Sequence, residues 1–174
     1  MELDSEPSHD SCLALLSGSA INQDGQSSSL TAPNGPSQQA LICSALDTTD
    51  GRRAADYNAL EMHGTGTSLG DPIEMGAAAQ VLLTSENSTA PLAVRASKSA
   101  HGHAEAGAGI LNTVHALTSI NYAYTCCLTH LRSLNPYVAE TTAKRALTSA
   151  PKENVPISTP SDFAALTGIC CVPP

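Results

Sequence analysis

Aromatic residues are scarce in this sequence: Phe, Tyr and Trp together make up 3% of it, and Trp is absent. A core must therefore consist of Ala, Leu, Ile and Val, and it offers no aromatic platform on which nucleic-acid bases could stack. Basic residues are also few, with 8 Lys and Arg against 16 Asp and Glu and a net charge of −8. Because no basic stripe is present, nucleic acid is not an expected partner.

Long apolar runs are missing as well. No run approaches the roughly 18 residues that a membrane-spanning helix needs, and no contact with a membrane is expected. Residues 1–6 are acidic and lack the apolar core of a signal peptide, so we predict a cytoplasmic protein. None of the six cysteines forms a C-x-x-C pair, which favours reduced thiols over a zinc site.

The order of the expected elements predicts the fold class. The chain has 174 residues, of which 41% are apolar, enough for a folded domain with a core. Expected strands at residues 12–16, 57–62 and 91–97 alternate with helices that begin near residues 36, 72 and 104, which predicts an α/β fold with a mainly parallel sheet. The third helix carries Ile110, Leu111, Val114, Leu117 and Asn121 at helical spacing.

The expected domain organisation has three parts. Residues 1–11 form a polar lead-in, residues 12–149 the domain, and residues 150–174, with five prolines, an irregular tail. Within the domain the signal weakens after residue 121. There we expect a strand and a turn at residues 128–138 and a helix at residues 139–149.

Residues 61–74 are the most informative stretch. An apolar run ends at His63, and a loop of Gly and Thr follows. Asp71 suits an N-cap, Pro72 the first helical position, and Glu74 the end of a D-x-x-E capping box. His63 is therefore expected at the carboxyl end of a strand, where open α/β sheets bind ligands.

A second polar cluster follows the next expected strand. Lys98, His101 and His103 come directly after residues 91–97, so His63 and His103 should be neighbours in space. A neutral imidazole can donate an N–H to a developing enolate, and Lys98 can bind a carboxylate or tune an imidazole. Two other interpretations stay open: polar residues that only satisfy loop ends, or a metal site of His63, His101 and His103.

The sequence offers no evident nucleophile. It has no G-x-S-x-G elbow, and Cys12 opens a strand rather than lying between a strand and a helix. The Gly64 to Thr67 loop lacks the Lys of a phosphate-binding P-loop. Its glycines allow close approach of a backbone, and the hydroxyls of Thr65 and Thr67 suit a polar, extended ligand.

Three blocks of sequence resemble a known family. Residues 18–25 with 30–39 resemble GSAVNQDG…LTAPNGPSQQ, residues 61–74 resemble EAHGTGTxLGDPIE, and residues 98–109 resemble KSNIGHxxAAAG. The chain is thus similar to the C-terminal half of a β-ketoacyl synthase (ketosynthase) domain of type I polyketide synthases. This resemblance implies the C-terminal half of a thiolase-like fold, with helices on both faces of a mainly parallel sheet.

The resemblance also implies a function. The family is an acyltransferase that condenses malonyl-type extender units, held on an acyl carrier protein, by decarboxylative Claisen chemistry in polyketide and fatty-acid biosynthesis. By motif position, His63 and His103 would stabilise the enolate and the oxyanion, and Lys98 would organise His103. The phosphopantetheine arm of the carrier is the substrate carrier, with no tightly bound cofactor and no metal expected. The implied phosphopantetheine-binding residues are Gly64, Thr65, Gly66 and Thr67.

The departures from the family pattern define the alternative. The DTACSSS-type segment with the nucleophilic cysteine and the GFGGTNAH segment are not found in this sequence, so half of an active site is expected, completed by the N-terminal ketosynthase half. Partners implied are that half, the carrier protein and acyl or malonyl thioesters, with a homodimer as a candidate assembly. Arg95 replaces a small residue, and a buried charge is costly unless it is paired. A single half would also expose an apolar face that the missing half should cover. The alternative is a truncated, non-catalytic remnant that acts as a binding or interaction module.

Overall fold

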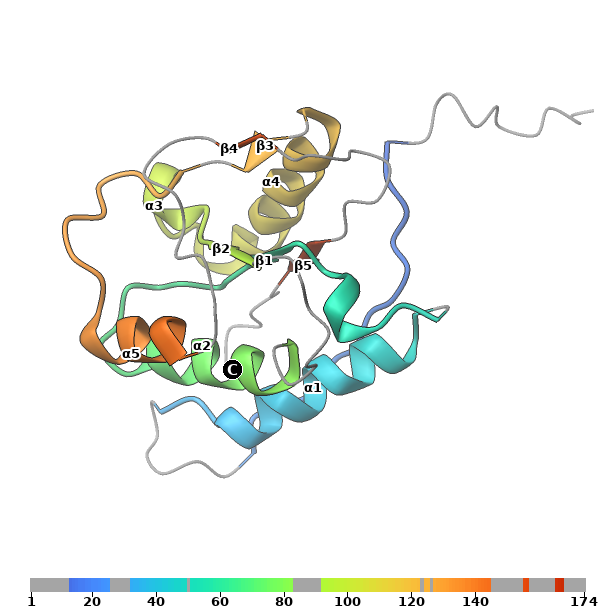
Figure 1. The fold of residues 1–174 in the computed structure, drawn as a ribbon, viewed down its shortest axis with the longest axis horizontal. Coiled ribbons are helices and arrows are strands. Elements are labelled where there is room, and N and C mark those ends of the chain that lie inside the picture. Colours follow the sequence, from blue (N-terminus) through green and yellow to red (C-terminus); the bar gives the residue numbers. More distant parts are fainter. Residues whose placement is uncertain are drawn as a thin grey trace, which may run out of the picture.

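A three-stranded parallel sheet lies at the centre of the fold in the computed structural model (Figure 1). The structure describes residues 13–25, 32–49, 51–82, 92–122, 124–125, 127–144, 155–156 and 165–167. Strand β1 (Ala59–Glu61) pairs with β2 (Ala93–Arg95) on one side and β5 (Ala165–Thr167) on the other. The predicted α/β class with a parallel sheet is confirmed. The predicted lead-in at residues 1–11 lies outside the described residues.

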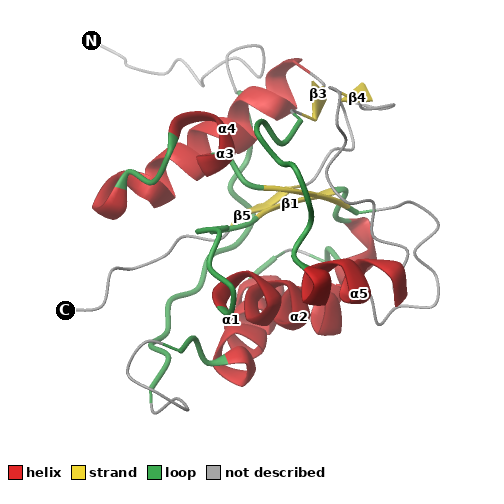
Figure 2. Cartoon of the chain, turned by 90° about the vertical axis from the view of Figure 1, so that its left-hand side faces the viewer, coloured by secondary structure: helices red, strands yellow, loops and turns green. Residues whose placement is uncertain are grey.

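Helices cover both faces of this sheet (Figure 2). On one face lie α1 (Gly35–Asp47), α2 (Gly70–Leu82) and α5 (Pro136–Lys144), and on the other α3 (Lys98–His101) and α4 (Ala108–Tyr122). Short 3₁₀ turns at Ala54–Asp56 and Glu105–Gly107, and an antiparallel pair of β3 (Tyr124–Thr125) and β4 (Val155–Pro156), complete the described elements. None of the described helices is long and apolar enough to cross a bilayer.

The two faces of the sheet have different chemistry. Side chains alternate between the faces of a strand, and Leu60 is in register with Val94, so these two share one face. Both belong to the buried apolar core, which α2 completes with Met75 and Leu82. Glu61 is in register with Arg95 on the opposite face, and both are almost fully buried.

Helix α4 covers the polar face of the sheet. Its buried residues are small or polar: Ala108, Gly109, Asn112, Ala116 and Ser119. The predicted helix is confirmed, but its apolar stripe is not the buried face, since Ile110 and Val114 are 71% and 51% exposed. The reason is that a polar sheet face selects the helix face that can approach closely and form hydrogen bonds.

The start of the helix before β1 agrees with the prediction from sequence, whereas the start of the helix after β1 does not. Helix α1 begins as predicted near Pro36, with the Asn34 side chain accepting the N–H of Ser37 as an N-cap. The predicted capping box of α2 is wrong: the helix begins at Gly70, whose N–H donates to the hydroxyl of Thr67. Asp71 and Glu74 are therefore inside the helix, and their carboxylates bind the preceding loop instead.

The first predicted strand is wrong over its described part. Residues 13–16 have no strand structure, and Leu13, Leu15 and Leu16 are 69%, 84% and 82% exposed. A strand needs a neighbour for its backbone hydrogen bonds, and residues 13–16 pair with none of the described strands. The exposed leucines agree with the expectation that this half of the fold has an uncovered apolar face.

The C-terminal predictions also need correction. Residues 128–135 contain no strand, and α5 begins at Pro136, three residues before the predicted helix. The tail at 150–174 is not irregular throughout, because β4 lies within it and β5 pairs in register with β1. Strands as short as β4 and β5 give too little periodicity to be found in the sequence. In the folded chain β5 forms because β1 supplies backbone hydrogen-bond partners for it. The domain boundaries themselves stay a prediction.

Candidate active site

His63 lies directly beyond the central strand. Strand β1 is fully buried, and the chain leaves the sheet after Met62, whose N–H donates to the carbonyl of Arg95 at 2.8 Å. The backbone N–H groups of His63 and Gly64 then donate to the two carboxylate oxygens of Glu74, at 2.5 and 3.0 Å. Glu74 thus fixes the turn that presents the imidazole, and burial raises the pKa of its carboxyl.

The backbone of this turn requires glycine at position 64. Gly64 has φ of +53°, in the left-handed region that residues with a Cβ adopt rarely. A Cβ at this position would lie 2.6 Å from the Cβ of Ala96, on the segment that follows β2. The absence of a side chain therefore lets the two strand ends approach each other.

Lys98 reaches the site from the end of β2. It is the first residue of α3, and its Nζ lies 3.2 Å from Nδ1 of His63. The resemblance assigned Lys98 to His103, whereas the hydrogen bond found here is to the first histidine. In this structure Lys98 thus contacts His63, and its role toward either histidine stays a prediction.

His103 completes the cluster. Gly102, with φ of +79°, ends α3 and turns the chain back. The imidazole rings of His63 and His103 lie with their centroids 5.3 Å apart and nearly perpendicular, at 83°. The backbone N–H of Glu105 donates to Nδ1 of His103 at 3.0 Å. The predicted proximity of the two histidines is confirmed, whereas their chemical roles stay a prediction.

These hydrogen bonds fix which nitrogen carries the proton. An ammonium group and a backbone N–H can only donate, so Nδ1 of both His63 and His103 must accept. The hydrogen of each neutral imidazole is then on Nε2. Burial, together with the positive charge of the neighbouring Lys98, lowers the pKa of His63 from 6.5 to about 4, so this ring is neutral at pH 7.

The predicted phosphopantetheine-binding residues lie on an exposed loop beside His63. The hydroxyls of Thr65 and Thr67 are 3.4 Å apart, and both residues are exposed. The N–H of Gly66, which has φ of +75°, donates to Asp71 at 3.1 Å, and burial raises the pKa of that carboxyl. Two carboxylates of α2 thus hold the loop, while Thr65 and Thr67 themselves are exposed.

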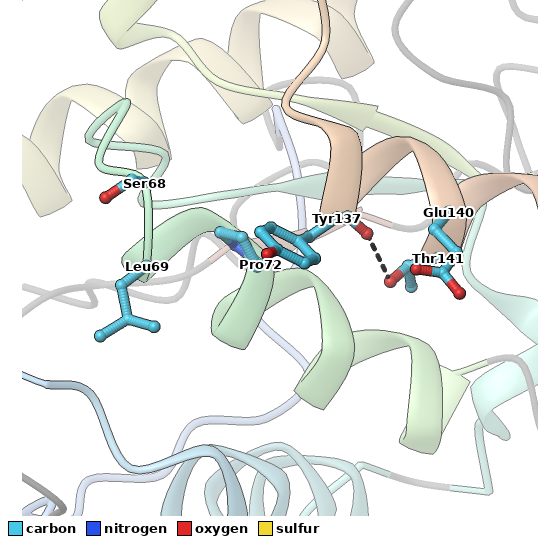
Figure 3. Close-up of a pocket in the computed structure, with 6 residues that line it drawn as sticks. All are labelled: Ser68, Leu69, Pro72, Tyr137, Glu140 and Thr141. Atoms are coloured by element: carbon cyan, nitrogen blue, oxygen red, sulfur yellow. Dashed lines mark hydrogen bonds between the residues drawn. The ribbon is translucent and has the colours of Figure 1, made fainter.

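An open pocket lies next to this loop (Figure 3). It has a volume of about 540 Å³ and lies between the start of α2 and α5. Its lining begins one residue after Thr67 and does not include His63, Lys98 or His103. The lining residues are Ser68, Leu69, Pro72, Tyr137, Glu140 and Thr141.

Sequence reasoning found the cluster but missed the buried network beneath it. It noted that Arg95 needs a partner, yet it did not identify Glu61, whose Oε2 lies 3.4 Å from Nε of Arg95. It also gave no role to His115 of α4, whose Nδ1 lies 2.8 Å from the same oxygen. One signal in the sequence could have revealed the Glu61–Arg95 pair. Both residues stand near the carboxyl ends of two expected neighbouring strands, where a carboxylate and a guanidinium can meet.

The other chemistry-bearing residues are not part of this cluster. His101 is exposed, and no three His, Cys, Asp or Glu side chains within the described ranges could hold a metal ion. Cys43 is exposed on α1, on the opposite face of the sheet from α3 (Figure 2). Cys12, weighed above as a nucleophile, lies outside the described residues.

A parallel sheet between two helix layers, with histidines after two successive strands, defines half of a thiolase-like fold. The chain belongs to the family of β-ketoacyl synthase C-terminal domains, whose model matches residues 13–132. It is 40% identical over 132 residues to part of a phenolphthiocerol/phthiocerol polyketide synthase of Mycobacterium tuberculosis, covering 76% of this chain. It is 44% identical over 110 residues, or 63% of this chain, to an erythronolide synthase of Saccharopolyspora erythraea.

Solved ketosynthase structures agree with this assignment. An oxazolomycin ketosynthase domain of Streptomyces albus is 29% identical and superposes with a TM-score of 0.76, over 84% of this chain. A bacillaene synthase ketosynthase of Bacillus subtilis is 30% identical, with a TM-score of 0.72 over 83% of this chain. The chain spans 25% of each of these structures and 6% and 3% of the two synthases above.

Proposed function

We propose that this chain supplies the histidine half of a ketosynthase active site. In this site His63 and His103 stabilise the enolate and the oxyanion of decarboxylative condensation, and Lys98 orients His63. The nucleophilic cysteine comes from the N-terminal half of the domain. The substrates are malonyl-type units on the phosphopantetheine arm of an acyl carrier protein.

One observation carries this proposal: both imidazoles accept a hydrogen bond at Nδ1 and are adjacent. Each ring therefore has its Nε2–H available for an oxygen that gains negative charge. Neutral donors that are fixed in advance stabilise such an oxygen because they need no reorganisation during the reaction. The low pKa of His63 favours the donor role, since an imidazole that stays neutral does not transfer its proton to the enolate.

The chemistry follows from these two donors. The malonyl carboxylate leaves as CO2, and its bonding electrons move to the adjacent carbon and the thioester oxygen, giving an enolate. Nε2–H of His63 and Nε2–H of His103 stabilise that oxygen. The enolate carbon then attacks the acyl thioester on the cysteine, the thiolate leaves, and the extended chain stays on the carrier.

The loop of Gly64 to Thr67 is proposed to bind the phosphopantetheine arm. Thr65 and Thr67 are exposed, and their hydroxyls can donate hydrogen bonds to the amide carbonyls of such an arm. The loop is held from behind by Asp71 and Glu74, so its outer side is available to a ligand.

The test is release of CO2 from malonyl-loaded carrier protein by the full chain, followed by mass spectrometry of the carrier. We expect conversion of malonyl to acetyl carrier protein without a condensed product. His63→Ala and His103→Ala should each reduce the rate by about 10²-fold, the usual effect of losing one oxyanion donor. The matched control is His101→Ala, which removes an exposed histidine from the same segment and should leave the rate unchanged.

Two outcomes would contradict the proposal. One is a folded wild-type chain that releases no CO2 above the rate of carrier alone. The other is an equal rate for wild type, His63→Ala and His103→Ala.

A non-catalytic binding module is the second candidate function. The observation in its favour is the exposure of Leu13, Leu15, Leu16 and Ile21, which together form an apolar segment at the surface. A folded chain that captures the N-terminal ketosynthase half, yet gives no decarboxylation alone or in the complex, would support this candidate instead.

A further inference from the structure

A buried hydrogen-bonded network lies beneath the catalytic cluster and joins the ends of β1 and β2 to α4. The N–H of Ser97 donates to Oε1 of Glu61 at 2.6 Å, and the Ser97 hydroxyl donates to Oδ1 of Asn112 at 2.6 Å. The Asn112 amide in turn donates to the carbonyl of Met62 at 3.1 Å. Glu61, Ser97 and Asn112 are each at most 2% exposed.

Arg95 and His115 hold the other carboxylate oxygen of Glu61. Its Oε2 lies 3.4 Å from Nε of Arg95 and 2.8 Å from Nδ1 of His115. Arg95 also donates to the Ser119 hydroxyl at 2.7 Å, and that hydroxyl donates to the carbonyl of His115. A buried carboxylate with such partners stays fixed in position, because any movement would leave a charge or a donor unsatisfied.

The network ends at the two residues that directly precede His63 and Lys98. Met62 is directly before His63, and Ser97 is directly before Lys98. Asn112 contacts both Met62 and Ser97, so one side chain bridges the two strand ends. The Nζ of Lys98 is 3.2 Å from Nδ1 of His63, and this distance depends on how the two backbones are placed.

We propose that Ser97 and Asn112 are positioning residues, which hold the start of α3 against the end of β1 so that the Lys98 ammonium stays in contact with His63. This inference rests on the proposed function of the cluster. The Lys98 side chain has four rotatable bonds and is strongly hydrated, so its own preference is to move toward water. A fixed backbone position at Lys98 therefore keeps its ammonium group in contact with His63.

The test reads the position of Lys98 through His63, without any catalysis. The charge of Lys98 is one cause of the low pKa of His63, so a displaced ammonium should let that pKa rise. We would titrate the His63 imidazole by NMR in the full chain, using His63→Gln to assign its resonances. Ser97→Ala should raise the pKa by about one unit, toward the value in Lys98→Ala, which serves as the upper reference.

Ser119→Ala is the matched control. It removes a serine hydroxyl that is equally buried and belongs to the same network, but that contacts Arg95 and His115 rather than the strand ends. It should lower the stability of the chain and leave the pKa of His63 unchanged. Thermal unfolding by circular dichroism would show whether the two variants lose similar stability.

Asn112→Ala tests the same bridge from its other end, and it decides the question if Ser97→Ala does not fold. The proposal is overturned if the folded variant keeps the wild-type pKa of His63, or if Ser119→Ala raises it as much. A raised pKa without any decarboxylation in wild type would support the positioning role and contradict the proposed function. A raised pKa together with a loss of rate of about tenfold in Ser97→Ala would support both.

Discussion

Replacing Arg95 with Met should destabilise the chain strongly, because it leaves the Glu61 carboxylate buried without its guanidinium partner. Glu61 is 0% exposed and Arg95 is 1% exposed, so neither charge reaches water. Breaking a buried pair from one side costs about 3–5 kcal/mol of unfolding free energy. This is a large part of the roughly 5–15 kcal/mol that stabilises a typical domain.

The double variant should recover most of this loss. In Glu61→Gln, the side-chain carbonyl still accepts from Ser97, and the new amide can donate to Nδ1 of His115. With Arg95→Met in addition, neither charge of the pair remains, and we expect stability within about 1 kcal/mol of wild type, since replacing a whole buried pair is often neutral. The assay is urea unfolding of the full chain, followed by circular dichroism, for wild type, both single variants and the double.

The matched control for this experiment is Arg53→Met. Arg53 pairs with Asp56 at the surface, with side chains 76% and 34% exposed, so the same substitution should cause little change. The reasoning is refuted if Arg95→Met costs less than about 1 kcal/mol, well below the cost of an unpaired buried charge. It is equally refuted if the two single losses simply add in the double variant.

Three further predictions test the turns and the site itself. The pKa of His63 should be about 4 by NMR, below its ordinary 6.5. The contribution of His63 to the free energy of unfolding is therefore full above pH 6.5 and is lost as the pH falls toward 4. A measured pKa near 6.5 would contradict this. Gly64→Ala should cost about 1–3 kcal/mol in urea unfolding, whereas Gly76→Ala, within α2 with open space around it, should be neutral or stabilising. Asn34→Ala should cost about 0.5–2 kcal/mol through loss of the α1 N-cap, and an unchanged midpoint would show that the cap does not contribute.

Much of the candidate site could be predicted from sequence because its signals are local. His63 and Lys98 each follow a short apolar strand, and both strands were found, although β1 and β2 are shorter than predicted. Parallel strands place their carboxyl ends at one edge of a sheet, so the proximity of His63 and His103 followed from topology alone. The contact of Lys98 with His63 could not be predicted, because it depends on distances between side chains.

Other parts of the fold could not be read from periodicity. The spacing of Ile110 and Val114 indicated an apolar stripe on α4, but these residues are exposed. Residues 13–16 have the composition of a strand and no strand partner among the described residues. Both errors have one cause: composition indicates what a segment can bury, and only its neighbours decide whether it does so.

The sequence by itself determined the family, the strand ends that carry His63 and Lys98, and the glycines that allow the turns between them. These depend on a residue and its near neighbours along the chain. Tertiary structure alone decided that Glu61 faces Arg95, that Asn112 bridges Met62 and Ser97, and that α4 buries its small and polar face. Strand register and helix packing are relations between segments far apart in sequence, so their physical basis appears only once the chain is folded.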